Sequence, residues 1–169
     1  MSDTAAATPA RTSAFGDLEH ELAGTRRVLE RVPEEHWSWR PHDKSMSLSR
    51  MATHLIEVLR IAESAATADR FDLAHEHVPD PAGREELLRR FDEAAERLLG
   101  GVRAVQPEAW SQPWALVRGE QVLRTVPRAA ALRSFGVNHH LHHRGQLTVY
   151  LRLLGVPVPG LYGPSADER

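Results

Sequence analysis

Four histidines lie within six residues near the end of the sequence, in the run Asn-His-His-Leu-His-His at positions 138–143. His139 and His143 are four residues apart, the spacing that places two side chains on one face of a helix. Apolar Phe135 and Leu147 lie in line with them. Two imidazoles that point inward at this spacing can bind one metal ion, as in other helical metal sites.

A third histidine, His54, lies on a separate apolar stripe with Met51, Leu55 and Val58. Metal sites in helix bundles are built from facing helices, so His54 can complete the set. The simpler alternatives are a hydrogen-bonded core histidine and an exposed histidine run that binds metal weakly. Burying adjacent imidazoles without a shared ligand would leave several ring nitrogens without partners, which favours the metal site.

The other two histidines of the run, His140 and His142, are rotated away from the pair. We expect one of them to face solvent or a partner subunit and the other to lie at the top of a pocket. His142 and His139 are also three residues apart, so His142 remains an alternative ligand.

Several neighbours are candidates for supporting the site. Glu57, three residues after His54, can accept an imidazole N–H or act as a base, although a solvated carboxylate is the simpler interpretation. Gln146 can orient a ligand, and Arg144 can bind an anionic substrate at the pocket mouth; for both, a plain surface residue is the alternative. Gly145 is costly inside a helix and predicts close helix packing beside the metal.

The composition limits the chemistry. The chain has 169 residues and no cysteine, which excludes disulfides, thiolate metal sites and a cysteine nucleophile. Three histidine ligands leave at least one coordination position open, as in catalytic metal sites. Zinc is the first expectation for the ion, with nickel or ferrous iron as alternatives. A formal net charge of -2 gives no reason to expect nucleic-acid binding.

Four helical segments would position these residues, and their apolar spacing predicts helices over 13–31, 47–68, 80–102 and 127–154. Ser13 is the expected cap of the first helix, and Asp80 with Pro81 begins the third. The long connection before the last helix contains a short hairpin, with strands at 114–117 and 121–125. The predicted fold is all-α, a four-helix bundle decorated by this hairpin.

Residues 1–12 are expected to form a disordered tail and 13–169 the single domain. No stretch is apolar for long enough to span a bilayer, and the start lacks the pattern of a signal peptide, so we expect a cytoplasmic protein.

The run His-His-Leu-His-His-Arg-Gly-Gln-Leu that starts at His139 resembles the last-helix signature of the DinB-like family of metal-binding four-helix bundles. The rest of the helix to Gly155 and Val-Pro-Val-Pro-Gly-Leu-Tyr-Gly-Pro-Ser at 156–165 are similar too, as are Trp-Arg-Pro at 39–41 and Ala-Thr-His-Leu at 52–55. The resemblance covers nearly the whole chain. It implies three histidine ligands, one on the second helix and two on the last, which map onto His54, His139 and His143.

The same resemblance implies a homodimer and a link to bacterial damage induction. Some relatives are transferases or isomerases that use a low-molecular-weight thiol such as mycothiol, bacillithiol or glutathione. The first functional hypothesis is therefore a metal-dependent transferase or hydrolase that activates a thiol or water towards a small-molecule substrate. The alternatives are a non-catalytic metal-binding stress-response module and a dimeric interaction protein with a vestigial site.

Overall fold

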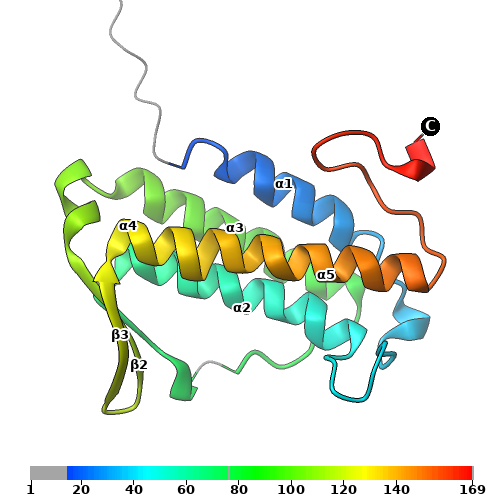
Figure 1. The fold of residues 1–169 in the computed structure, drawn as a ribbon, viewed down its shortest axis with the longest axis horizontal. Helices are drawn as coiled ribbons and strands as arrows, with labels where there is room; N and C mark the ends of the chain where they lie inside the picture. Colours follow the sequence, from blue (N-terminus) through cyan, green and yellow to red (C-terminus); the bar gives the residue numbers. More distant parts are fainter. Residues whose placement is uncertain (1–14, 76, 169) are drawn as a thin grey trace, which may run out of the picture.

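The computed structural model describes residues 15–75 and 77–168, and it is mostly helical (Figure 1). The main helical elements are α1 (Leu18–Leu29), α2 (Leu48–Thr67), α3 (Arg84–Ala104), α4 (Arg128–Ala131), a π-helical segment (Leu132–Asn138) and α5 (His139–Leu153). The last three run on from one another without a break and form one long helix, residues 128–153, which we call the last helix. Short 3-10 turns occupy Glu34–His36, Leu73–His75, Pro107–Ser111 and Ala166–Glu168.

The helices lie side by side around one core. α2 packs against α3 on one side and against the last helix on the other, while α1 packs against α3 and α5. The apolar stripe of α2 is buried as its spacing predicts, and Leu48, Leu55 and Val58 are fully inaccessible to solvent. α2 therefore lies at the centre of the packing and carries His54.

A three-stranded sheet lies at one end of the helices. β2 (Pro113–Arg118) and β3 (Gln121–Pro127) form the predicted antiparallel hairpin, and Gly119 turns the chain with φ 58°. The sequence did not predict β1 (Arg70–Asp72), which pairs in parallel with β2 and makes the sheet mixed. The mostly helical prediction is thus confirmed, and the all-α class is corrected by this small sheet.

The ends of the helices follow local capping, and several of them differ from the prediction by two or more residues. Ser47 caps α2 as a side-chain acceptor for the Arg50 N–H, and Gly155 (φ 72°) ends the last helix. The third helix begins at Arg84 and not at Asp80, because the Asp80 carboxylate accepts from Ser49 and does not cap the helix. α1 begins at Leu18, five residues after the predicted start, and ends at Leu29, two residues before the predicted end; α3 continues to Ala104, two residues beyond its predicted end.

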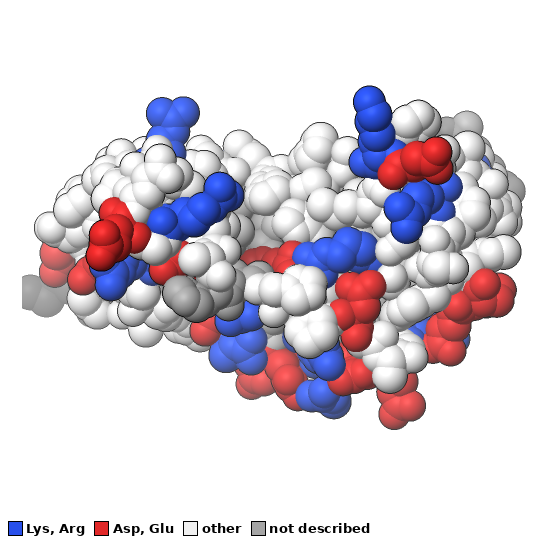
Figure 2. Space-filling model, turned by 90° about the horizontal axis from the view of Figure 1, so that it is seen from below, with Lys and Arg blue, Asp and Glu red and all other residues white. Residues whose placement is uncertain are grey.

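The expected tail 1–12 and the expected cap Ser13 lie outside the described residues. Within the described part of the chain, no helix combines the length and apolar character needed to cross a membrane. On the face seen in Figure 2, acidic and basic side chains of the described residues are interspersed and no extended area carries charge of one sign.

Candidate metal centre

The last helix approaches α2 closely where it carries its histidines. At Gly136, in the π-helical segment, an added Cβ would lie 2.7 Å from the Cβ of Ala62 on α2. Only a residue without a side chain permits this approach. The π-helical segment ends at Asn138, and His139 is the first residue of α5.

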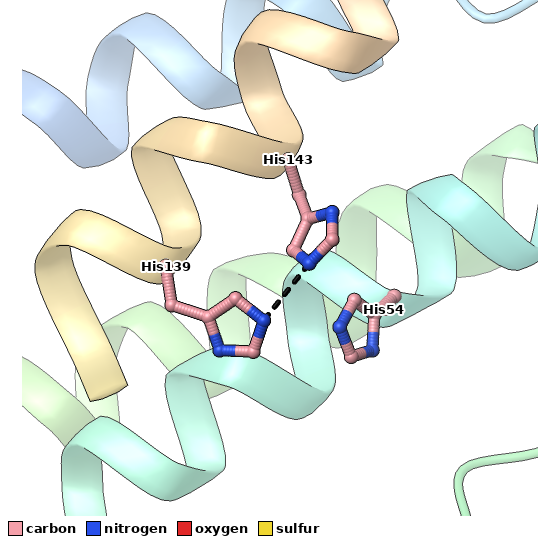
Figure 3. A group of neighbouring side chains, drawn as sticks. All are labelled: His54, His139 and His143. Atoms are coloured by element: carbon pink, nitrogen blue, oxygen red, sulfur yellow. Dashed lines mark hydrogen bonds between the residues drawn. The ribbon is translucent and has the colours of Figure 1, made fainter. Parts of the chain in front are cut away.

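His54, His139 and His143 come together from the two facing helices (Figure 3). One ring nitrogen from each lies within 4.8 Å of the other two. The Nε2 atoms of His139 and His143 are 2.8 Å apart. The ring centroid of His54 lies 4.5 Å from that of His143 and 5.3 Å from that of His139. All three side chains are half-buried, so the group lies at the edge of the core.

Each of these rings has a hydrogen-bond partner directed away from the centre of the group. His54 Nδ1 lies 2.8 Å from Glu57 Oε2, and His143 Nδ1 lies 2.7 Å from Gln146 Oε1. The His139 ring donates to the backbone carbonyl of Phe135. A neutral imidazole has one N–H and one lone pair, so a ring that donates outward turns its lone pair inward.

The consequence is a cluster of converging lone pairs. When the His54 and His143 Nδ1 atoms donate to Glu57 and Gln146, and the His139 ring donates to Phe135, the Nε2 atoms of His139 and His143 face each other as two acceptors. Two acceptors at 2.8 Å repel unless a cation lies near both. The donor set is therefore suited to a shared positive ion.

The pKa values of the histidines favour the neutral form. Burial lowers the pKa of His143 to about 4, with a further contribution from the neighbouring His54 and His139. Burial and the proximity of His54 also lower the pKa of His139. Neutral rings are the form in which histidine binds metals, so these two are ready for an ion without first losing protons.

Glu57 is a buried partner of the site. Although its burial alone would raise its pKa, hydrogen bonds from His54, Arg50 and the Val78 N–H lower the pKa of Glu57 to about 2. The interpretation of Glu57 as a solvated carboxylate is therefore wrong. It is an ionised acceptor that fixes the orientation of His54, as Gln146 does for His143.

His140 and Arg144 belong to a different face of the last helix. His140 is 4% exposed and its Nε2 lies 2.8 Å from Thr25 Oγ1 on α1. Arg144 donates to the Glu21 carboxylate at 2.7 Å and to the Tyr162 hydroxyl at 2.6 Å. His140 does not lie at the top of a pocket, and the surface and pocket-mouth interpretations of Arg144 are both wrong. Both side chains are core groups that hold α1.

His142 and Gly145 lie on the outer face of the last helix. His142 is exposed, with its ring 4.9 Å from that of His143, and it does not belong to the histidine group. Gly145 is also exposed, and an added Cβ there would meet nothing within 4 Å. The predicted close packing at Gly145 is wrong, and Gly136 is the glycine at which a helix approaches.

Sequence reasoning missed three contributors. Val78 and the α1 pair Glu21 and Thr25 carried no sequence signal, because their partners are distant in the chain. The spacing of Arg50 to Glu57, two helical turns, is the only local signal, and it is common on helix surfaces.

Comparison with known proteins identifies related chains. The model of the DinB family matches residues 10–169. The protein YrdA of Bacillus subtilis (strain 168) is 27% identical over 150 residues, which cover 89% of this chain and 86% of YrdA.

Two solved structures share the fold. A DinB-like protein from Bacillus cereus ATCC 10987 superposes with a TM-score of 0.71 at 20% identity, covering 87% of this chain and 94% of that one. The DinB-like protein YjoA from Bacillus subtilis has a TM-score of 0.66 at 17% identity, covering 91% and 98%. At these identities the likeness shows the fold alone.

Proposed function

The chain belongs to the DinB family, whose model matches residues 10–169, and on that premise we propose that it binds one divalent metal ion through His54, His139 and His143. The observation that carries the proposal is the convergence of three ring nitrogens whose outward partners turn the lone pairs inward. Zinc is the proposed ion, with nickel and ferrous iron as the alternatives that accept imidazole ligands.

The distances between the nitrogens fit such an ion. Nitrogens about 2.0–2.1 Å from a tetrahedral zinc ion lie about 3.3 Å from one another. The His139 and His143 Nε2 atoms are somewhat closer than this, at 2.8 Å, and all three candidate atoms lie within 4.8 Å of one another.

His54, His139 and His143 would hold the divalent ion, and it would supply a Lewis acid able to bind a thiol or a water molecule. We infer that the chain is an enzyme of the transferase or hydrolase type, acting on a small molecule with a low-molecular-weight thiol or water as co-reactant. The half-buried position of the histidines supports this, because a ligand can approach from the side that the core leaves open.

The contribution of the protein is orientation. Glu57 and Gln146 hold the rings of His54 and His143 so that the same nitrogen of each always faces the centre. Glu57, ionised and buried, also places a negative charge behind His54, which makes that ring a better donor to a cation. Homodimer formation, expected from the family, remains a prediction.

The metal proposal is tested by elemental analysis of purified protein and by zinc titration. We expect one ion per chain in the wild type and a large loss of bound metal in His54→Ala. His142→Ala is the matched control, since His142 lies on the same helix as two ligands but is exposed and outside the group. Full metal content in His54→Ala, or loss in His142→Ala, would contradict the ligand set.

The enzymatic proposal needs a separate test. Metal-loaded protein is incubated with a panel of electrophiles and with mycothiol, bacillithiol, glutathione or water as co-reactant, and product is measured against His54→Ala. Turnover that disappears in the variant supports the transferase or hydrolase. Stoichiometric metal with no turnover in the panel favours the alternative, in which the ion joins α2 to the last helix without catalysis.

A further inference from the structure

The carboxylate of Glu57 contacts more than His54. Its Oε2 faces His54 and also accepts from the guanidinium of Arg50, while its Oε1 accepts the backbone N–H of Val78 at 3.0 Å. Val78 is 21 residues further along the chain, in the connection between β1 and α3. One buried carboxylate thus joins a candidate metal ligand to a segment outside the helices.

The segment Val78–Asp80 is attached to α2 at further points. Arg50 donates to the Val78 carbonyl at 3.2 Å and forms an ion pair with Asp80 at 3.5 Å. Ser49 donates to Asp80 Oδ2 at 2.6 Å. All of these contacts come from the first turn of α2 and from Glu57, and the segment itself has no helical or strand hydrogen bonding. Arg90 of α3 also donates to the Pro79 carbonyl at 2.9 Å, so the segment is held both by α3 and by the side chains that surround His54.

We propose that Glu57 couples ion binding at the three histidines to the attachment of the Val78–Asp80 segment. The inference rests on the proposed metal site and adds that the Val78–Asp80 segment responds to the ion. A metal on His54 Nε2 requires the proton on Nδ1, and this tautomer donates to Glu57 and holds the carboxylate in the orientation that presents Oε1 to Val78. An ion on Nε2 withdraws electron density from the ring and makes the Nδ1–H a stronger donor, so Glu57 is held more firmly with the ion than without it.

Coupling of this kind acts in both directions. The ion strengthens the attachment of the segment, and an attached segment keeps Glu57, and through it His54, in the orientation that binds the ion. Glu57 and Arg50 act here as positioning residues, since neither is proposed to touch the ion. Asp80 is more distant from the site and acts only through the segment.

The test uses the full chain with zinc as the only added ligand and measures two quantities. The first is the hydrogen-exchange rate of the Val78 amide, resolved by NMR, with and without zinc. We expect zinc to slow this exchange by about fivefold, the lower end of usual coupling between sites. The second is the zinc Kd of Asp80→Ala. We expect this Kd to be higher than that of the wild type, by at most the same fivefold.

Asp92→Ala is the matched control. Asp92 is also an aspartate paired with an arginine, Arg26, but this pair joins α3 to α1 and contacts neither His54 nor Glu57. We expect its zinc Kd and its Val78 exchange rate to equal those of the wild type. Thermal melting of both variants checks that they are folded, and Asp80→Asn, which preserves the shape of the side chain, replaces Asp80→Ala if the latter is not.

The outcomes separate this inference from the metal proposal. One zinc per chain, with Val78 exchange unchanged by zinc and a wild-type Kd in the Asp80 variant, overturns the coupling and leaves the metal site intact. Weakened zinc binding in Asp92→Ala as well overturns it also, because the effect would then not be specific to the segment. A wild type that binds no zinc overturns both.

Discussion

At the scale of single residues, the last helix carries two sets of polar groups on different faces. His139 and His143 face α2, while the next residue after each, His140 and Arg144, faces α1. Arg144 is 3% exposed at its side chain and forms an ion pair with Glu21, which is 10% exposed. Replacing only one partner of such a pair lowers the stability of the fold strongly, because the charge of the other partner stays buried without compensation.

We expect His140 to make the stability of the protein depend on pH. Burial lowers the pKa of His140 to about 3 from 6.5, and the positive charge of Arg144 contributes. At a pH between these two pKa values, the unfolded chain binds a proton at His140 and the folded chain does not. Stability is therefore full above the unfolded pKa and falls as the pH decreases through the window, by about 1.4 kcal/mol per pH unit for one proton.

The measurement is urea unfolding of the metal-free protein, with chelator, at several pH values below neutrality. We expect His140→Gln, which cannot take up a proton, to lose part of the wild-type slope, equivalent to about one proton. Equal slopes in the wild type and the variant would mean that His140 titrates alike in both states.

At the scale of elements, two glycines of the last helix have opposite roles. Gly136 allows the π-helical segment to approach Ala62, and its replacement by alanine forces the two helices apart. We expect Gly136→Ala to destabilise the protein by about 1–3 kcal/mol, as overpacking does, and to weaken zinc binding because His54 moves away from the pair.

Gly145→Ala is the control in the same helix. The added methyl group meets nothing within 4 Å, and alanine is favoured over glycine in a helix by about 1 kcal/mol. Denaturant unfolding should therefore show Gly145→Ala to be more stable than the wild type and Gly136→Ala less stable. A neutral Gly136→Ala would show that the approach of the helices is not tight in solution.

At the scale of the whole molecule, the candidate ligands join α2 to the last helix, the two elements that pack at the centre. An ion that binds the folded chain alone adds stability by mass action, about 2.7 kcal/mol at a free concentration of 100 times Kd. For a chain of this size the melting temperature should rise by roughly 5–10 °C. Differential scanning calorimetry with zinc, and again after chelation, measures the shift; the His54→Ala chain should show none.

The sequence was sufficient for the helices, the hairpin and the three histidines, because each has a local signal: apolar spacing, a turn glycine, or ligands four residues apart. It was insufficient for β1, whose three residues form a strand only through pairing with β2. It was also insufficient for His140 and Arg144, since buried polar residues appear as surface residues until their partners on α1 are known.

The π-helical segment has a consequence for how the length of the chain can vary. A π turn holds about one residue more than an α turn, so a chain with one residue fewer in that segment can span the same distance through ordinary α-helical turns. A deletion of one residue in that segment can thereby be absorbed ahead of His139 without rotating the later turns of the helix. Beyond that point there is no such tolerance. Losing one residue between His139 and His143 would turn the rest of the helix by about 100°, so that residues which now face α2 would no longer do so.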